Sequence, residues 1–398
     1  MDATALDHHL TDAQRELLEA TSAHARETLA PLGGREDGRV NRPLVRALGD
    51  TGLLGRLFVP DDAGGWAPEV SALDLCLIRE GLARVSTEAE TAFAVQGLGS
   101  FPILQSGRPE VVAAWMPRIA SGEAVAAFAL SEPGAGSDAA ALALRAERDG
   151  DVFRLTGEKT WISNAPDADV YTVFARTTPD AGARGVTAFC VPRDTPGLSG
   201  EALELVSPHA IGRLTFADAV VPADHVLGEE DRGFRVAMRT LDLFRPSVGA
   251  FAVGMGQAAL DAAVAHATTR MAFGKPLAGQ QALAHRLADA ATALAAARLL
   301  VHQAALAYDK GLRPVTQVAA MAKLLATETA QGVVDLAVQV HGAAALQQGH
   351  LLEHLYRDVR APRIYEGASE VQREIIARAL LTPPAAAPQA TATASARA

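Results

Sequence analysis

The stretch RIYEGASEVQR, residues 363–373, is the part of this sequence that indicates one fold and one chemistry most specifically. Ile364 and Tyr365 form an apolar wall, and Glu366 places one carboxylate beside it. Gly367 follows, and the lack of a side chain lets another group approach the backbone closely. A carboxylate against an apolar surface loses hydration, which raises its proton affinity. The stretch therefore predicts a general base that works near neutral pH.

The composition is that of an ordinary globular chain with an acidic balance. Of 398 residues, 49% are hydrophobic and 21% are charged, which leaves room for two or three domains. Acidic residues number 46 and basic residues 36, so the formal net charge is −10. Because phosphate binding requires a basic surface, we do not expect nucleic acid to be a main partner.

Two features bear on where the protein works. Cys76 and Cys190 are far apart and lack metal-type spacing, which favours a reducing compartment. Residues 1–10 show no basic segment followed by an apolar run, so no signal peptide is predicted. No uninterrupted apolar stretch is long enough to span a bilayer. We therefore expect a cytoplasmic protein with no membrane segment.

The hydrophobic period changes twice along the chain. Helical spacing dominates residues 1–123, β-branched and aromatic runs dominate 124–232, and long Ala- and Leu-rich helical segments return over 233–381. Residues 382–398 are mostly Pro, Ala and Thr, and we expect them to be disordered. The sequence thus predicts an α+β chain in which a helical domain, a β-domain and a helical bundle follow one another.

Individual elements follow from the same patterns. Helices are predicted from a Thr11–Gln14 capping box onward and around 44–54, 72–84, 110–120, 282–308 and 315–340. Strands are predicted at 152–157, 169–175, 185–191, 213–216 and 219–221. Loop signals at 60–65 and 106–109 separate helices of the first domain.

The first motif, FALSEPGAGSD over 128–138, is a glycine-containing loop. Gly134 and Gly136 precede Ser137 and Asp138, so backbone N–H groups of the loop can face an anion such as a pyrophosphate. Taken alone, a Gly-x-Gly of this kind is more often an ordinary surface loop before a strand.

The second motif, GEKTWISN over 157–164, places the Trp161 indole and the Ser163 hydroxyl on the same face of a strand. An indole stacks on a planar ring, and a hydroxyl bonds a ring nitrogen. The alternative interpretation, a core tryptophan of the β-domain, is the commoner one for such a motif in isolation.

Two further motifs carry charge. RMAFGKPL over 270–277 sets Arg270, whose guanidinium can fork onto phosphate oxygens, beside a tight turn, and Gln281 follows eleven positions after Arg270. A solvated helix end is the alternative. LDLFR over 241–245 places Asp242 and Arg245 on one helical face, where a surface ion pair is the alternative.

In their order and approximate spacing, these four motifs and the Glu366 segment resemble the acyl-CoA dehydrogenase family, from about residue 11 to residue 381. The resemblance implies that family's fold: an N-terminal helical domain, a β-barrel-like middle domain and a C-terminal four-helix bundle. It also implies FAD as the cofactor and a homotetramer built as a dimer of dimers, with each flavin at a subunit interface.

The same resemblance assigns roles to individual residues. Residues beside the flavin and its pyrophosphate would be Leu130, Ser131, Ser137, Trp161 and Ser163. Residues reaching the FAD of a neighbouring subunit would be Arg270, Phe273, Gln281, Gln339 and Gly342. Residues meeting the acyl-CoA would be Ser137, Asp242, Arg245 and Gly367, with Glu366 as the base.

One role can be tested within the sequence. Some members of the family carry the base just before the arginine of the Leu-Asp-x-x-Arg stretch. Here that position is Phe244, which cannot take a proton, whereas Glu366 stands in the commoner position. Both observations favour Glu366.

The chain also departs from the family pattern. Ala343 and Ala345 stand where a Gly-Gly-x-Gly loop is usual and add methyl groups where a close cofactor approach is expected. Ala368 replaces a favoured threonine and removes a hydroxyl donor. The segment 207–212 is shorter than usual, which would alter the substrate that fits.

A possible metal motif is HLLEH over 350–354, because His350 and His354 share a helical face at i, i+4, with Glu353 between them. No third ligand is identifiable and the segment lies within the flavoprotein resemblance. We therefore favour two solvated histidines on an amphipathic helix and predict no metal.

The implied reaction is α,β-dehydrogenation of an acyl thioester. Glu366 takes the α-proton, the β-hydrogen leaves as hydride to flavin N5, and an electron-transfer flavoprotein is the expected acceptor. The flavin ribityl hydroxyl and the Glu366 backbone N–H would stabilise the enolate. Side chains that narrow the acyl pocket would favour a short or modified acyl group: Phe93, Gln96, Phe244 and Phe251.

Three alternatives remain open from the sequence. One is a dehydrogenase of a carrier-protein-bound acyl thioester, and another is a flavin oxidase or monooxygenase on the same fold. The third is a silent scaffold that has lost FAD, supported only by Ala343, Ala345 and Ala368 and opposed by Glu366 and Trp161.

Overall fold

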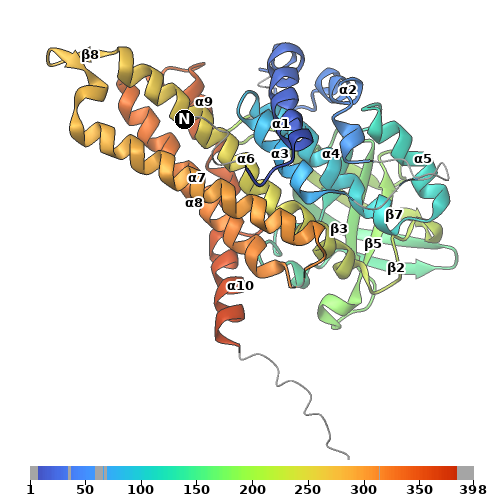
Figure 1. Cartoon of the computed structure of the whole chain (residues 1–398). Coiled ribbons are helices and arrows are strands. Elements are labelled where there is room, and N and C mark those ends of the chain that lie inside the picture. Colours follow the sequence, from blue (N-terminus) through green and yellow to red (C-terminus); the bar gives the residue numbers. More distant parts are fainter. Residues whose placement is uncertain (1–7, 35–36, 59–65, 67–69, 313, 383–398) are drawn as a thin grey trace, which may run out of the picture.

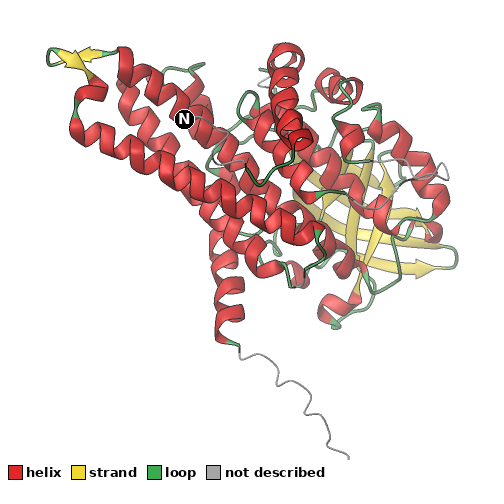
Figure 2. Ribbon diagram, in the orientation of Figure 1, coloured by secondary structure: helices red, strands yellow, loops and turns green. Residues whose placement is uncertain are grey.

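The computed structural model describes residues 8–34, 37–58, 66, 70–312 and 314–382. Within this part of the chain, N-terminal helices, a central sheet and long C-terminal helices follow one another (Figures 1 and 2). This order confirms the predicted α+β class. Three predictions fall wholly or partly outside the described residues: the loop at 60–65, the absence of a signal peptide, which concerns residues 1–7, and the tail, which concerns residues 383–398.

The N-terminal part is built from helices that bury their apolar faces. The Thr11 hydroxyl accepts from Gln14 N and the Gln14 side chain accepts from Thr11 N, at 3.2 and 3.1 Å, so the capping box is confirmed. The helices are α1 (Asp12–His24), α2 (Arg42–Asp50), α3 (Ala72–Ala83), α4 (Thr87–Ser106) and α5 (Pro109–Ala120). The helix predicted over 44–54 ends earlier, at Asp50, because Gly52 adopts a positive φ of 76°.

The middle part is one seven-stranded sheet with the order β1-β4-β2-β3-β7-β6, and β5 pairs with β4. The end strands do not pair with each other, so the barrel-like domain is a partial barrel. The strands are β1 (Ala126–Ala129), β2 (Arg145–Asp149), β3 (Val152–Ser163), β4 (Val170–Arg176), β5 (Val186–Pro192), β6 (Leu198–Ala202) and β7 (Ile211–Pro222). The sequence did not predict β1, β2 or β6, because they are short and β2 and β6 expose most of their residues.

Strand β3 is irregular at the second motif. Its register against β7 shifts between Lys159 and Ile162, and Trp161 has a φ of 58°. A bulge of this kind re-aims side chains. The Trp161 indole is therefore 58% exposed, whereas the neighbouring Ile162 is 1% exposed. A core tryptophan, the alternative interpretation, is wrong.

The C-terminal part is a bundle of α6 (Gly233–Thr269), α7 (Gln281–Asp309), α8 (Thr316–His341) and α10 (Ser369–Leu381), with the short α9 (Leu351–Asp358) beside α8. Strands β8 (Met271–Ala272) and β9 (Lys275–Pro276) form a hairpin between α6 and α7. Figure 1 shows this hairpin at one end of the molecule and the large sheet at the opposite end.

Helices α6 and α7 are more apolar than we expected from the sequence, which predicted no stretch long enough to span a bilayer. By length and composition, α6 and α7 could each cross a membrane, but 72% of the apolar window of α6 is buried inside the protein. Helix α6 packs against α3, α7 and α8. Its apolar character is therefore explained by a central position in the core.

Gln96 on α4 joins the helical part to the sheet. It is completely buried, its Nε2 donates to Ala124 O at 2.9 Å, and its Oε1 accepts from Ala126 N at 2.8 Å. Both ends of the amide thus satisfy backbone groups next to β1. The polar atoms of Gln96 are thus used within the fold, and its effect on an acyl pocket stays a prediction.

Replacement of Gln96 by Leu should lower the free energy of unfolding by about 2–4 kcal/mol, because two buried backbone groups lose their partner. Urea denaturation monitored by circular dichroism measures the change. Gln303→Leu, at an exposed position of α7, is the control and should stay within about 0.5 kcal/mol of wild type. Equal stabilities for the two variants would show that Gln96 does not join the layers.

Candidate active site

Glu366 lies in a tight turn between η10 (Ala361–Arg363), a single 3₁₀ turn, and α10. Its φ is 50° and that of Gly367 is 94°, so both residues adopt left-handed backbone conformations. A Cβ on Gly367 would lie 2.3 Å from Gln372 Nε2, which explains the glycine. For Glu366 this backbone conformation costs about 1–3 kcal/mol, so the surrounding structure must impose it.

Helix α8 holds this turn from both sides. The completely buried Lys323 donates from Nζ to Gly367 O at 2.6 Å, and burial lowers the pKa of its ammonium to about 8. Gln372 Nε2 donates to the same carbonyl at 2.9 Å. Five residues after Lys323, the Glu328 carboxylate pairs with Arg363 at 2.9 Å and accepts from Ser369 Oγ at 2.6 Å. The residues before and after Glu366 are therefore fixed to one helix.

The Glu366 carboxyl lies in a buried, charged environment. Its Oε2 atom is buried and no described residue hydrogen-bonds it. Burial raises the pKa of Glu366 above its ordinary value, while the positive charges of Arg79, Lys323 and Arg245 act in the opposite direction. A carboxylate with a raised pKa and an unpaired oxygen is ready to accept a proton.

Arg245 and Asp242 lie on α6 near this carboxyl. Arg245 Nη1 and Asp242 Oδ1 are 3.3 Å apart, and the side chains are 9% and 29% exposed. The alternative of a surface ion pair is therefore wrong. Burial lowers the pKa of Arg245, and its Nε is buried without a partner among the described residues. An unpaired buried donor in this position is available to a ligand.

The first two motifs meet through a buried ion pair that the sequence analysis missed. Lys159 Nζ lies 2.7 Å from Glu132 Oε1 and donates to Leu130 O at 2.9 Å. Glu132 also accepts from Ala143 N and Leu144 N. Burial lowers the pKa of Lys159 to about 8. The sequence offers no local signal for this pair, because Glu132 lies in the glycine-containing loop after β1 and Lys159 stands next to Glu158.

This ion pair positions the residues predicted beside a flavin. Ser131 O accepts from Thr160 N at 3.0 Å, so Leu130 and Ser131 lie beside the Trp161 bulge. Ser137 is exposed on the same loop. A hollow of about 400 Å³ lies next to them and is lined by Glu132, Pro133, Gly134, Ala141, Ala143, Leu144, Gly157 and Glu158.

A second connection links β3 to α9. Ser163 Oγ and His209 Nε2 are 2.8 Å apart, and burial lowers the pKa of His209 to about 4, so the imidazole is neutral. Ser207, in the same short segment, donates to Asp358, and Asp358 also contacts His354 at 3.0 Å. The segment 207–212 thus ties the Ser163 strand to the helix that leads to Glu366. Apart from the altered loop length, no pattern in the sequence predicts the role of His209.

The residues predicted to reach a neighbouring subunit gather elsewhere. Arg270, Phe273 and Gln281 belong to the β8–β9 hairpin and its flanking helix ends. The His266 and His341 rings are 4.2 Å apart, which brings the end of α8, with Gln339 and Gly342, to the same end of the bundle. Phe273 is 94% exposed there. Figure 1 shows that this end lies far from the sheet, so one chain does not join the two groups.

The alanines that depart from the family pattern occupy different environments. Ala345 is completely buried in the helical core and Ala343 is exposed. The methyl group of Ala345 therefore faces the core of the bundle. Ala368 is the N-cap residue of α10 and provides no side-chain hydrogen bond there.

The histidines of the possible metal motif have other partners. His350 is the N-cap of α9, where its Nδ1 accepts from Leu352 N at 3.1 Å. His354 contacts Thr87 Oγ1 at 2.7 Å and Asp358 at 3.0 Å. His350 thus stands before the helix rather than on its face, whereas the His354 side chain is 41% exposed, as a solvated histidine would be. In the described part of the chain, no group of three or more His, Cys, Asp or Glu side chains is arranged to hold a metal ion.

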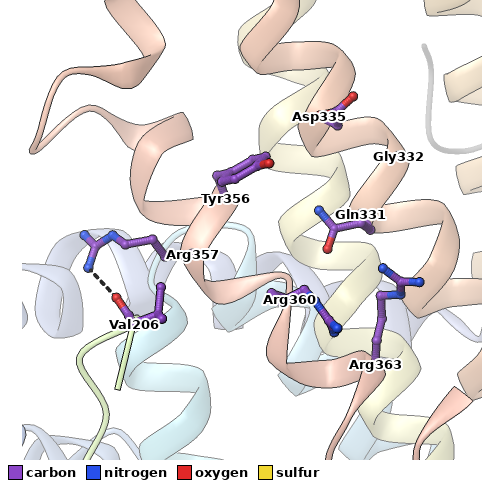
Figure 3. A pocket seen from close by; sticks show the side chains of 8 residues that line it. All are labelled: Val206, Gln331, Gly332, Asp335, Tyr356, Arg357, Arg360 and Arg363. Atoms are coloured by element: carbon purple, nitrogen blue, oxygen red, sulfur yellow. Dashed lines mark hydrogen bonds between the residues drawn. The ribbon is translucent and has the colours of Figure 1, made fainter. Parts of the chain in front are cut away.

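A cavity lies beside the Glu366 segment rather than around the carboxylate. It has a volume of about 510 Å³ and opens between α8, α9 and the loop before β7 (Figure 3). It contains three arginines, of which Arg357 pairs with Glu353 at 2.6 Å and Arg363 with Glu328. Its lining is Val206, Gln331, Gly332, Asp335, Tyr356, Arg357, Arg360 and Arg363.

A glutamate with a buried, unpaired Oε2 atom and a strand with an exposed indole are the groups expected at a flavin-dependent dehydrogenase site. Comparisons with known proteins give the class. Sequence profiles of the acyl-CoA dehydrogenase N-terminal, middle and C-terminal domains match residues 11–123, 127–219 and 231–381. The chain belongs to the acyl-CoA dehydrogenase family. It is an FAD-dependent enzyme that dehydrogenates acyl-CoA.

Individual relatives support this assignment. The chain is 36% identical over 372 residues to cyclohexane-1-carbonyl-CoA dehydrogenase of Geobacter metallireducens, covering 92% of this chain and 97% of the relative. Butyryl-CoA dehydrogenase from Megasphaera elsdenii superposes with a TM-score of 0.86 at 34% identity, covering 94% and 99% of the two chains. PigA, solved with FAD and proline, superposes with a TM-score of 0.87 at 27% identity, covering 94% and 99%.

The described residues fit FAD. The exposed indole of Trp161 offers a flat apolar surface beside the Ser163 hydroxyl, and a Cβ on Gly134 or Gly136 would meet no described atom within 4 Å. These features match an aromatic ring system joined to a pyrophosphate.

Proposed function

We propose that Glu366 is the catalytic base that removes the α-proton of the acyl thioester. The observation that carries this proposal is the buried Oε2 atom, which no described residue hydrogen-bonds although three cations lie near the carboxyl. Burial keeps the proton affinity high, and the cations keep enough carboxylate present to act as a base. The imposed backbone conformation fixes the position of the carboxylate before substrate arrives.

Substrate is held by groups that the fold has already positioned. The acyl-CoA is contacted by Asp242, Arg245, Ser137 and Gly367. The buried Nε atom of Arg245 supplies a hydrogen-bond donor that no described residue uses. The Glu366 backbone N–H faces the thioester carbonyl and stabilises the negative charge that develops there. The bond from Lys323 to Gly367 O fixes the Gly367–Ala368 peptide, directly after the turn residue that carries this N–H.

FAD is held by Leu130, Ser131, Ser137, Trp161 and Ser163 of the same chain. When bound, it accepts the β-hydrogen as a hydride. His209 keeps the Ser163 hydroxyl beside the bulge through their 2.8 Å contact. The neutral imidazole adds no charge to this position.

The complete FAD site is formed between subunits of a homotetramer. The FAD of a neighbouring subunit is contacted by Arg270, Phe273, Gln281, Gln339 and Gly342. This contact accounts for the distance between their end of the bundle and the sheet within one chain (Figure 1). The 94% exposure of Phe273 supports this assembly, since a large aromatic exposed at the tip of the β8–β9 hairpin is suited to a contact surface. An electron-transfer flavoprotein accepts the electrons, and the enzyme works in the cytoplasm.

Glu366→Gln should lower the rate of anaerobic flavin reduction by an acyl-CoA about 10²–10⁴-fold, because the amide cannot take the α-proton. The absorbance of the bound flavin measures this rate and also shows that FAD is retained. Glu370→Gln, at an 83% exposed side chain on the next helix, should behave as wild type. A Glu366→Gln variant that bleaches its flavin at the wild-type rate would remove Glu366 from this role.

Lys323→Met should move the pH dependence of flavin reduction to higher pH. Lys323 is one of the cations that lower the pKa of Glu366, so its removal makes the carboxyl harder to ionise. Rates measured across pH 5–9 locate the inflection. Lys310→Met, at an exposed helix end, should leave it in place. An inflection that moves to lower pH in Lys323→Met would contradict the proposed charge balance.

Phe273→Ala should weaken FAD binding about tenfold or more, because an aromatic side chain that packs on the neighbouring subunit and its cofactor is lost. Fluorescence of FAD released on dilution measures this affinity. Leu381→Ala, another exposed apolar residue, should retain wild-type affinity. Unchanged FAD binding and unchanged assembly in Phe273→Ala would argue against the shared site.

A further inference from the structure

A second charged pair is buried near Glu366, and the catalytic proposal does not use it. Arg79 on α3 is 2% exposed and Glu90 on α4 is completely buried. Arg79 Nε donates to Glu90 Oε1, and Arg79 Nη1 donates to Ser247 Oγ at 2.7 Å. Ser247 lies on α6, two residues after Arg245. The pair therefore joins three helices at the place where they approach the base.

Several observations place this pair beside the reacting centre. Among the cations near Glu366, Arg79 acts most strongly on the Glu366 pKa. The charge of Glu366 in turn contributes to the raised pKa of Glu90, after the larger effect of burial. The ring of Phe251 lies 5.9 Å from the Arg79 guanidinium and gives the pair an apolar neighbour. Arg79 and Glu90 thus lie on the side of Glu366 formed by α3, α4 and α6.

Stability does not explain the pair. Removing two charges from water costs more than their attraction commonly offsets, and apolar residues of similar size often serve as well. The positions of α3 before Arg79 are apolar and buried, including Leu75, Leu77 and Ile78, whereas Glu80 directly after it is a second buried charge, paired with Arg298. Of these two pairs only Arg79–Glu90 acts on the pKa of Glu366, which indicates a functional role for it.

The pair retains hydrogen-bonding capacity. The Arg79 guanidinium makes its hydrogen bonds through Nε and Nη1. Its third nitrogen, Nη2, has no acceptor among the described residues. Glu90 Oε2 has only a 3.4 Å contact with Thr91 Oγ1. Ser247 Oγ donates to Phe244 O at 2.6 Å, so its proton is already used. One donor and one acceptor therefore lie side by side, next to the base.

We propose that Arg79 and Glu90 are specificity-determining residues that recognise a hydroxyl group on the acyl chain. A hydroxyl accepts from Arg79 Nη2 and donates to Glu90 Oε2 at once, so it satisfies both open groups. The preferred substrate is then a short hydroxyacyl thioester whose hydroxyl lies beyond the reacting carbons 2 and 3. This inference rests on the proposed role of Glu366 as the base, since that role fixes where the acyl chain lies.

Other acyl groups fit the pair less well. A plain alkyl group would exclude water from the pair without replacing its hydrogen bonds, which weakens binding by about tenfold or more. A terminal carboxylate would face Glu90 and Glu366, and like charges at short distance repel each other. The hydroxyl is the group that matches both the charge and the hydrogen-bonding capacity of the pair.

The test compares acyl thioesters in which a hydroxyl replaces a methyl group. The FAD-loaded enzyme is mixed anaerobically with 4-hydroxybutyryl-CoA against pentanoyl-CoA, and with 5-hydroxypentanoyl-CoA against hexanoyl-CoA. The second-order rate constant of flavin bleaching should favour the hydroxyacyl member of at least one pair by about tenfold or more. A wild-type enzyme that prefers the alkyl member of both pairs, or does not distinguish them, overturns the inference.

A double variant locates the preference. Arg79→Leu combined with Glu90→Leu removes both charges and should abolish or invert the ratio within each pair of thioesters. Because a ratio is compared within one enzyme, a changed pKa of Glu366 affects both members alike. The matched control is Glu80→Met combined with Arg298→Leu, which removes the buried pair formed by the next residue of α3 with α7, 2.7 Å apart. This control should keep the wild-type ratio, and a double variant at residues 79 and 90 that also keeps it overturns the inference.

Equilibrium binding separates this inference from the catalytic proposal. S-(4-hydroxybutyl)-CoA and S-pentyl-CoA are thioethers that cannot be dehydrogenated, and calorimetry gives their Kd values. Wild type should bind the hydroxyalkyl thioether about tenfold more tightly, and the double variant should not. If no thioester bleaches the flavin but this preference holds, the catalytic proposal fails and the recognition stands. If alkyl thioesters bleach the flavin and neither assay shows a preference, only the recognition fails.

Discussion

The hydrogen bond from the buried Lys323 ammonium to the Gly367 carbonyl is the interaction on which the site depends. It fixes the Gly367–Ala368 peptide, and together with the Gln372 hydrogen bond to the same carbonyl it holds the turn in which Glu366 has a left-handed backbone. Without both partners of this carbonyl, Glu366 would relax to an ordinary conformation and its carboxyl would leave its position. The position of α8 in the bundle, buried on one face against α6 and α7, therefore determines where the base stands.

The same lysine also takes part in the charge balance around the base. Burial alone would keep the Glu366 carboxyl protonated, and a protonated carboxyl accepts nothing. Lys323, Arg245 and Arg79 reduce this effect without forming a hydrogen bond to the Oε2 atom. The cations lie on three different helices, α8, α6 and α3, so the protonation of Glu366 depends on the packing of the whole helical core. This arrangement keeps part of the Glu366 carboxyl ionised, as a base requires, and leaves its Oε2 atom without a hydrogen bond from the described residues, so that this oxygen is available to a substrate.

Local patterns predicted much of the fold and the identity of the base. The period of apolar residues located the long helices, and the Tyr-Glu-Gly turn located Glu366, because both depend on neighbours in the chain. The Trp161 bulge was not predicted, since its cause is a register shift against β7. The pairing of Lys159 with Glu132 and of Arg79 with Glu90 joins segments through tertiary packing. Lys159 and Arg79 each stand beside another charged residue, Glu158 and Glu80, so the sequence does not mark them out and their partners depend on how the layers pack.

The central claim, that Glu366 removes an α-proton, is tested most directly by proton exchange in the absence of hydride transfer. Acetyl-CoA has α-hydrogens but no β-carbon, so only the base can act on it. The FAD-loaded enzyme is incubated with acetyl-CoA deuterated on its methyl group, and mass spectrometry follows the loss of deuterium to water. The account predicts exchange by wild type and only the uncatalysed rate with Glu366→Gln. Equal exchange by both proteins would contradict it.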